Sequence, residues 1–107
     1  MTTFDEREKA FENKFAHEEE MLFRVTARRN RLLGVWAADL MKLTPEESEA
    51  YARSVVQAEF EESGDEDVVR KLHGDLLSAL VEIDESDIRQ KMDEKLVEAK
   101  RQLLGSI

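Results

Sequence analysis

The densest group of basic side chains in the sequence is a cluster of three arginines, Arg28, Arg29 and Arg31. Trp36 follows this cluster one to two helical turns later. Guanidinium groups bind phosphate through paired hydrogen bonds, so these residues form a candidate site for an anion or a nucleotide. The sequence has no glycine-rich phosphate loop, and a contact with ADP or ATP would therefore be superficial and weak. The alternative is a solvated helix face on which the arginines pair with Glu or Asp.

His17 stands directly before three glutamates, Glu18 to Glu20. Histidine changes its charge close to neutral pH, and neighbouring carboxylates favour the protonated imidazole. His17 is therefore a candidate pH sensor, with an inert surface histidine as the alternative. The second histidine, His73, lies near an apolar stripe and is expected at the edge of the packed core.

An acidic run extends from Glu61 to Asp67. It does not have the spacing of a calcium loop, because Val69 occupies a position that requires an oxygen ligand. Neither histidine has a second histidine at the spacing of a zinc site. Cysteine is absent, and no set of Ser, His and Asp residues indicates a nucleophilic triad. We therefore expect no metal, no cofactor and no enzymatic activity.

The first fifteen residues contain three of the five phenylalanines of the chain, Phe4, Phe11 and Phe15. These residues and Leu22 follow one another at intervals of seven, four and seven positions, which places them on one face of a helix. Burial of each phenylalanine would contribute roughly 1.5–3 kcal/mol, whereas ordering a free segment costs roughly 2–5 kcal/mol. Docking is therefore favourable if a partner supplies a groove for this face. The alternative is that the segment folds back or pairs with a second copy of itself.

Strong helix formers predominate in the sequence, which contains one proline and four glycines. Residues typical of helix caps and helix breaks divide the chain into four segments. The candidate starts are Thr44 with Pro45 and Glu47, Ser63 or Asp65, and Asp84 or Ser86, and the candidate ends are Gly64 and Gly105. Helices are therefore expected at residues 3–42, 45–62, 65–81 and 85–104.

Apolar residues recur at helical spacing in each segment, which predicts the residues that face the core. The stripes are Leu22, Val25, Leu32, Leu33, Trp36 and Leu40; Ala52, Val55, Val56 and Phe60; Val69, Leu72, Leu76 and Leu80; and Ile88, Met92, Leu96, Ala99 and Leu103. Short loops make successive helices antiparallel neighbours. The predicted fold is all-α, a small antiparallel four-helix bundle.

The first expected helix is about twice as long as the others. At about 1.5 Å per residue it would measure roughly 60 Å, against roughly 25–30 Å for each of the other three. Three short helices cannot cover it, so one half must overhang, fray or break. Its second half holds core residues such as Trp36, which leaves the N-terminal half without a partner. We therefore expect an N-terminal segment at residues 1–19, a long or partly disordered helical extension, and a four-helix bundle at residues 20–107.

The negative charge of the chain is concentrated in its second part. Residues 1–42 carry eight basic and eight acidic side chains, whereas residues 43–107 carry eight basic and 17 acidic ones, which accounts for the net charge of −9. Such a chain is repelled by nucleic acids and by anionic membranes, so neither is an expected partner. The first twenty residues mix charged and apolar side chains, unlike a secretory signal. We expect a cytoplasmic protein that is monomeric when free and does not insert into a membrane.

Several literal stretches of the sequence resemble one known family. These are FDEREKAFENKFAHEEE at residues 4–20, ARRNRLLGVWAADLM at 27–41 and GDEDV at 64–68, followed by a last helix with Ile88 and Met92. They resemble the zeta subunit family, small regulatory proteins that inhibit the F-type ATP synthase of alphaproteobacteria. The resemblance covers essentially the whole chain and is most specific in residues 4–17 and 27–41.

This resemblance implies a fold and a mechanism. Members of the family are four-helix bundles whose mobile N-terminal segment enters the catalytic interface between the alpha and beta subunits of the soluble ATPase head, close to the rotating gamma subunit. The segment becomes helical there and blocks rotation in the direction of ATP hydrolysis, while synthesis is much less affected. The protein would then lie at the periphery of the inner membrane, held there through ATP synthase.

The same resemblance implies roles for individual residues. Phe4, Phe11 and Phe15 would be the apolar anchors of the inhibitory segment. The basic residues Arg7, Lys9 and Lys14 would contact acidic groups of the ATPase head. The alternative function is a small helical module that binds a nucleotide or an anion through the arginine cluster and Trp36.

Overall fold

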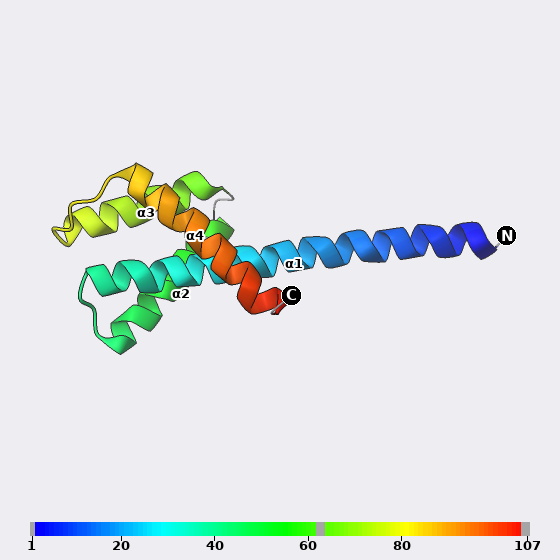
Figure 1. Ribbon diagram of the computed structural model, residues 1–107, viewed down its shortest axis with the longest axis horizontal. Coiled ribbons are helices and arrows are strands. Elements are labelled where there is room, and N and C mark those ends of the chain that lie inside the picture. Colours follow the sequence, from blue (N-terminus) through cyan, green and yellow to red (C-terminus); the bar gives the residue numbers. More distant parts are fainter. Residues whose placement is uncertain (1, 62–63, 106–107) are drawn as a thin grey trace.

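The computed structural model describes the backbone of residues 2–61 and 64–105, and the side chains of residues 17–59 and 64–105. Four helices follow one another: α1 at Thr2–Leu40, α2 at Pro45–Glu61, α3 at Asp65–Ser78 and α4 at Glu85–Leu104. Successive helices run in opposite directions (Figure 1). The predicted all-α fold with four helices is therefore confirmed, and each predicted helix end lies within three residues of the observed one.

The start of α2 has the predicted capping box. The Glu47 N–H donates a hydrogen bond to the Thr44 hydroxyl over 3.2 Å, and the Thr44 N–H donates to the Glu47 carboxylate over 2.8 Å. These two bonds satisfy N–H groups that the helix leaves unpaired at its first turn. The same Thr44 bonds hold the pKa of the Glu47 carboxyl below its ordinary value.

The start of α4 agrees with one of its two predicted caps, whereas the start of α3 does not have the predicted cap Asp65. Asp84 is the N-cap of α4, and its N–H donates to the Asp87 carboxylate over 3.3 Å. Gly64 itself is the N-cap of α3, so the prediction of Asp65 as a cap is wrong, and Asp65 is the first helical residue instead. The other predicted cap, Ser63, lies outside the described residues.

The C-terminus of α3 lies three residues before its predicted end. The Leu80 N–H donates to the Leu77 carbonyl and the Val81 N–H to the Leu76 carbonyl, each over 2.9 Å. This hydrogen-bond pattern is typical of a helix end at which one residue adopts the left-handed conformation. Here that residue is Leu80, with a φ of 64°. The turn directs Leu80 into solvent, where 92% of it is exposed. The prediction of Leu80 as a core residue is therefore wrong.

The core comprises one cluster to which every helix contributes. Its buried members are Leu33, Ala37, Val55, Val68, Val69, Leu72, Leu76, Ile88 and Met92, with Trp36, Met41, Tyr51, Val81 and Ile83 packed against it. Most of the predicted stripes are thus confirmed. Two predicted core residues of α1 are exposed instead, Leu22 at 64% and Leu40 at 39%. The side chain of Phe60 lies outside the described residues.

Helix α1 is the axis of the fold. It packs against each of the other three helices, and α3 lies against both α2 and α4. Its N-terminal part projects beyond the bundle, and the C-terminal end of α4 lies beside its middle (Figure 1). The molecule therefore measures 65 × 29 × 25 Å. None of the described helices combines the length and the apolar character needed to cross a membrane.

Candidate functional site

The N-terminal part of α1 is the most prominent candidate site. Of the described α1 side chains, Val25 is the first buried one, at 3% exposure. Between His17 and Arg24 every side chain is exposed except Met21, which is half-buried. Helix α1 thus continues for more than twenty residues on the N-terminal side of Val25 (Figure 1). The overhang predicted from the length of this helix is confirmed.

The predicted contact residues of this segment are only partly described. The backbone of residues 2–16 is helical, as the spacing of the phenylalanines requires. The side chains of Phe4, Arg7, Lys9, Phe11, Lys14 and Phe15 lie outside the described residues. Their role in partner binding stays a prediction.

His17 is exposed on the projecting part of α1. No hydrogen bond or ion pair joins it to the other described residues, and the nearby Glu20 pairs with Arg24 over 2.8 Å instead. His17 is thus accessible to solvent and to a partner. Its role as a pH sensor stays a prediction.

The three members of the arginine cluster do not all meet at one site: Arg28 and Arg31 line a common hollow, whereas Arg29 is buried in a separate contact with Asp65. Arg28 donates to the Gln102 side-chain oxygen on α4 over 2.8 Å, whereas Arg31 donates to Glu49 on α2 over 2.7 Å. The Arg31 bond and charge hold the pKa of the Glu49 carboxyl below its ordinary value. The two arginines therefore serve as links between helices, and this arrangement does not favour a shared nucleotide site.

Trp36 is separated from the arginine cluster by its own contacts. It is half-buried and packs against the core. The Lys91 ammonium of α4 lies 5.8 Å from the centre of a Trp36 ring, within the range of a cation–π interaction. This ring therefore contacts α4 and is not aligned with the arginines for stacking on a base.

A buried polar network at the root of the projecting segment was not predicted. Arg29 is 5% exposed, and its guanidinium donates to the Asn30 side-chain oxygen over 3.0 Å and to Asp65 over 2.9 Å. The Asn30 amide in turn donates to Glu59 over 3.3 Å. A buried charge is tolerated when it is paired in this way. The network ties α1 to the end of α2 and to the start of α3.

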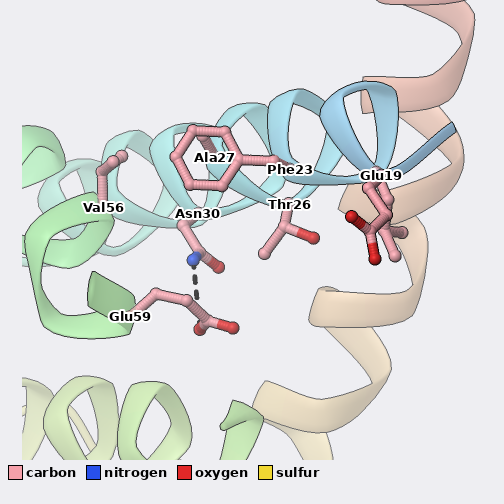
Figure 2. Close-up of a pocket in the computed structure, with 8 residues that line it drawn as sticks. Glu19, Phe23, Thr26, Ala27, Asn30, Val56 and Glu59 are labelled. Atoms are coloured by element: carbon pink, nitrogen blue, oxygen red, sulfur yellow. Dashed lines mark hydrogen bonds between the residues drawn. The ribbon is translucent and has the colours of Figure 1, made fainter. Parts of the chain in front are cut away.

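An apolar groove next to this network was also missed. It encloses about 490 Å³ between α1 and α2 and is lined by Glu19, Leu22, Phe23, Thr26, Ala27, Asn30, Val56 and Glu59. In Figure 2 the side chains of Thr26 and Glu19 extend from one side of α1. Asn30 extends from the same side and is hydrogen-bonded to Glu59 of α2. Leu22 is 64% exposed and Phe23 55% exposed at the edge of the groove. The sequence signal was Phe23, a large apolar residue outside the predicted stripe.

The described residues offer no other chemistry. They contain no group of three or more His, Asp or Glu side chains that could hold a metal ion. Every buried polar atom of a described side chain has a hydrogen-bond partner, so none of them is left to orient a ligand. The projecting helix and the groove at its base are therefore the features that point to a function, and both are suited to binding a protein.

Comparison with known proteins agrees with this description. The family model of the ATPase inhibitor subunit zeta matches residues 1–102. A protein whose solution structure was solved by NMR is 41% identical, with a TM-score of 0.70 over 81% of this chain and 99% of that chain. Nothing among the curated proteins matches the sequence. Because the family model covers nearly the whole chain, the protein belongs to the ATPase inhibitor subunit zeta family.

Proposed function

We propose that the protein inhibits ATP hydrolysis by the F-type ATP synthase and that residues 1–19 are its inhibitory element. The observation that carries this proposal is the helical segment on the N-terminal side of Val25, which projects beyond the other three helices (Figure 1). A helix of this kind is marginal in water without a partner. Membership of a family of ATPase inhibitor subunits supports the ATPase as that partner.

The segment inhibits by insertion. It enters the catalytic interface between an alpha and a beta subunit, close to the gamma subunit, with Phe4, Phe11 and Phe15 as apolar anchors. Burial of three phenylalanines, at roughly 1.5–3 kcal/mol each, exceeds the roughly 2–5 kcal/mol needed to order a segment. Positive charges at Arg7, Lys9 and Lys14 pair with acidic groups of the enzyme. A helix wedged into an interface that must open and close stops rotation in the hydrolytic direction.

The bundle limits how far the segment enters. It is much wider than the single helix of about 10–12 Å diameter that precedes it. The Arg29 network fixes the root of this helix to α2 and α3, since Arg29 contacts Asp65 and lies 3.7 Å from Glu59. The projecting helix therefore leaves the bundle in a defined direction. The complex lies at the ATPase head, on the cytoplasmic side of the inner membrane.

Paired substitution of Phe11 and Phe15 by alanine tests the proposal. The double variant should inhibit ATP hydrolysis by the purified ATPase head at least tenfold more weakly than the wild type, because each lost ring removes more than 1.4 kcal/mol of burial. Its melting temperature should be unchanged, because the segment precedes Val25, the first buried side chain among those that the structure describes. The matched control replaces two exposed apolar residues of the bundle, Leu77 and Val97, and should inhibit normally. A large fall in the melting temperature of the Phe11/Phe15 variant would place the rings in the core and refute the proposal.

A further inference from the structure

We infer that the groove between α1 and α2 is a second contact site for the ATPase head, and that it takes a segment with a large apolar side chain beside a lysine or arginine. This site adjoins the inhibitory segment: Glu19 is the last residue of that segment, and the other described residues that line the groove lie on its bundle side. It rests on the proposed function, since its occupant is a segment of the ATPase head.

Leu22 and Phe23 give the groove an exposed apolar lining. These two adjacent residues are 64% and 55% exposed at the edge of the groove, whose floor includes Ala27 and the half-buried Val56. Large apolar residues that gather beside a concave surface mark an interaction site. The volume of about 490 Å³ falls within the range of roughly 300–1,000 Å³ that is typical of binding pockets. The groove is therefore large enough for a bulky side chain of a partner.

The rim of the groove carries two carboxylates. Glu19 and Glu59 line the groove, and among the described residues that line it with them there is no cation (Figure 2). Glu59 is bonded to Asn30 and lies 3.7 Å from the Arg29 guanidinium, so its charge is compensated. Glu19 has no hydrogen bond or ion pair with the other described residues and supplies the uncompensated charge of the rim. Complementary charge selects partners and accelerates association. The rim therefore favours a lysine or an arginine next to the apolar side chain.

Phe23 also lines a second, smaller hollow, which is basic. This hollow of about 370 Å³ shares Phe23, Ala27 and Val56 with the groove and is lined in addition by Arg24, Arg28 and Arg31. Each of these arginines already has a partner on this chain: Glu20, Gln102 and Glu49 respectively. Glu20 and Glu49 compensate the charges of Arg24 and Arg31, so Arg28, whose partner is uncharged, supplies the positive charge of this hollow. A cationic side chain of the partner is therefore attracted to Glu19 and repelled by Arg28, which orients the bound segment.

The identity of the occupant follows from the position of the groove along α1. Leu22 lies seven residues after Phe15, which is about 10 Å along a helix. A partner that holds Phe15 in its interface therefore reaches the groove without any rearrangement of the bundle. A second copy of this chain would have to bind at the same place and would compete with the ATPase head.

The test uses the full chain and the purified ATPase head. Phe23→Ser and Glu19→Gln remove the apolar and the charged part of the site, and Leu77→Ser and Glu82→Gln are the matched controls at the opposite end of the bundle. We expect Phe23→Ser to raise the concentration for half-maximal inhibition about tenfold and Glu19→Gln to raise it about threefold at low salt. Maximal inhibition should be unchanged in both, and the two controls should match the wild type. Melting temperatures show that each variant is folded.

The outcomes separate the groove from the inhibitory segment. If the wild type inhibits and the folded groove variants inhibit at the same concentrations, the groove inference is wrong and the proposed function stands. If the wild type does not inhibit, the proposed function is wrong, and the groove inference falls with it. A photoreactive residue at Thr26 should crosslink to a subunit of the ATPase head, whereas one at Leu77 should not. A dimer of the wild type that Phe23→Ser dissociates would assign the groove to a second copy and overturn the inference.

Discussion

Gly34 of α1 lies against Ala52 of α2 so closely that a Cβ atom on Gly34 would be 2.6 Å from the Ala52 Cα. The same added atom would lie 3.3 Å from a methyl carbon of Val55, a buried core residue. Glycine permits this approach because it has no side chain. This contact sets the distance between α1 and α2, the two helices that line the groove at the root of the projecting segment.

Gly34→Ala should destabilise the protein. The new methyl group meets backbone rather than a movable side chain, so α1 and α2 must separate and loosen the core around Leu33. Overpacking of this kind typically costs about 1–3 kcal/mol. The melting temperature, measured by circular dichroism, should fall by about 4–8 °C for each kcal/mol. An unchanged melting temperature would show that the helices can separate without loss of packing.

Gly74→Ala should have the opposite effect. Gly74 lies in the interior of α3, is exposed, and has nothing within 4 Å of an added Cβ atom. Alanine is favoured over glycine in a helix by roughly 0.5–1 kcal/mol. The melting temperature should therefore rise by several degrees. A decrease would indicate a contact at this position that the structure does not contain.

Leu80→Gly should also stabilise the protein. Leu80 has a φ of 64° and is 92% exposed, so it strains the backbone and buries almost no surface. The left-handed conformation costs a residue other than glycine roughly 1–2 kcal/mol. The control is Leu77→Gly in the last turn of α3, where the same change should destabilise by up to about 1 kcal/mol. Equal effects of the two substitutions on the melting temperature would contradict the assigned turn.

Leu80 also shows where reasoning from sequence stops. The spacing of Val69, Leu72 and Leu76 predicted a stripe that Leu80 continues, and nothing in the local sequence marks Ser78 as the last helical residue. The predicted starts at Thr44 and Asp84 were better defined because a capping residue bonds to the next turn of its own helix. A helix end without glycine or proline depends on the tertiary structure instead.

Alkaline pH should destabilise the protein through Tyr51. Its hydroxyl donates to the Asp75 carboxylate over 2.7 Å, and burial together with this bond raises its pKa far above the ordinary value. Above the ordinary pKa of about 10, the unfolded chain loses the tyrosine proton while the folded chain keeps it, so stability falls as the pH rises. Below that pH Tyr51 keeps its proton in both the folded and the unfolded chain, and its contribution to stability is fully present.

Tyr51 is the only tyrosine, so tyrosinate absorbance reports this residue alone. Absorbance and circular dichroism should change together in an alkaline titration, because Tyr51 ionises when the chain unfolds. Tyr51→Phe should lose this dependence of stability on pH above about 10. It should also lose stability at neutral pH, since Asp75 then loses one hydrogen bond. Ionisation of Tyr51 in the folded protein near pH 10 would contradict this explanation.

The candidate site divides in the same way between predicted and unpredicted residues. The projecting segment followed from the length of α1 alone, because three short helices cannot cover a helix of 39 residues. The buried environment of Arg29 could not be predicted from the sequence, because it depends on Asp65 and Glu59, which are distant in the sequence. Asn30 was a usable signal: it lies three and seven residues before the buried Leu33 and Ala37, and a polar residue on an apolar stripe requires a buried partner.

The role of the projecting segment is tested most directly by removing it. A chain without residues 1–19 keeps Val25 and every described buried side chain, so we expect it to fold with the melting temperature of the full chain. Its inhibition of ATP hydrolysis by the purified ATPase head should be lost, even at concentrations far above those at which the full chain inhibits. Inhibition by the truncated chain at the same concentrations as the full chain would contradict the assignment of residues 1–19 as the inhibitory element.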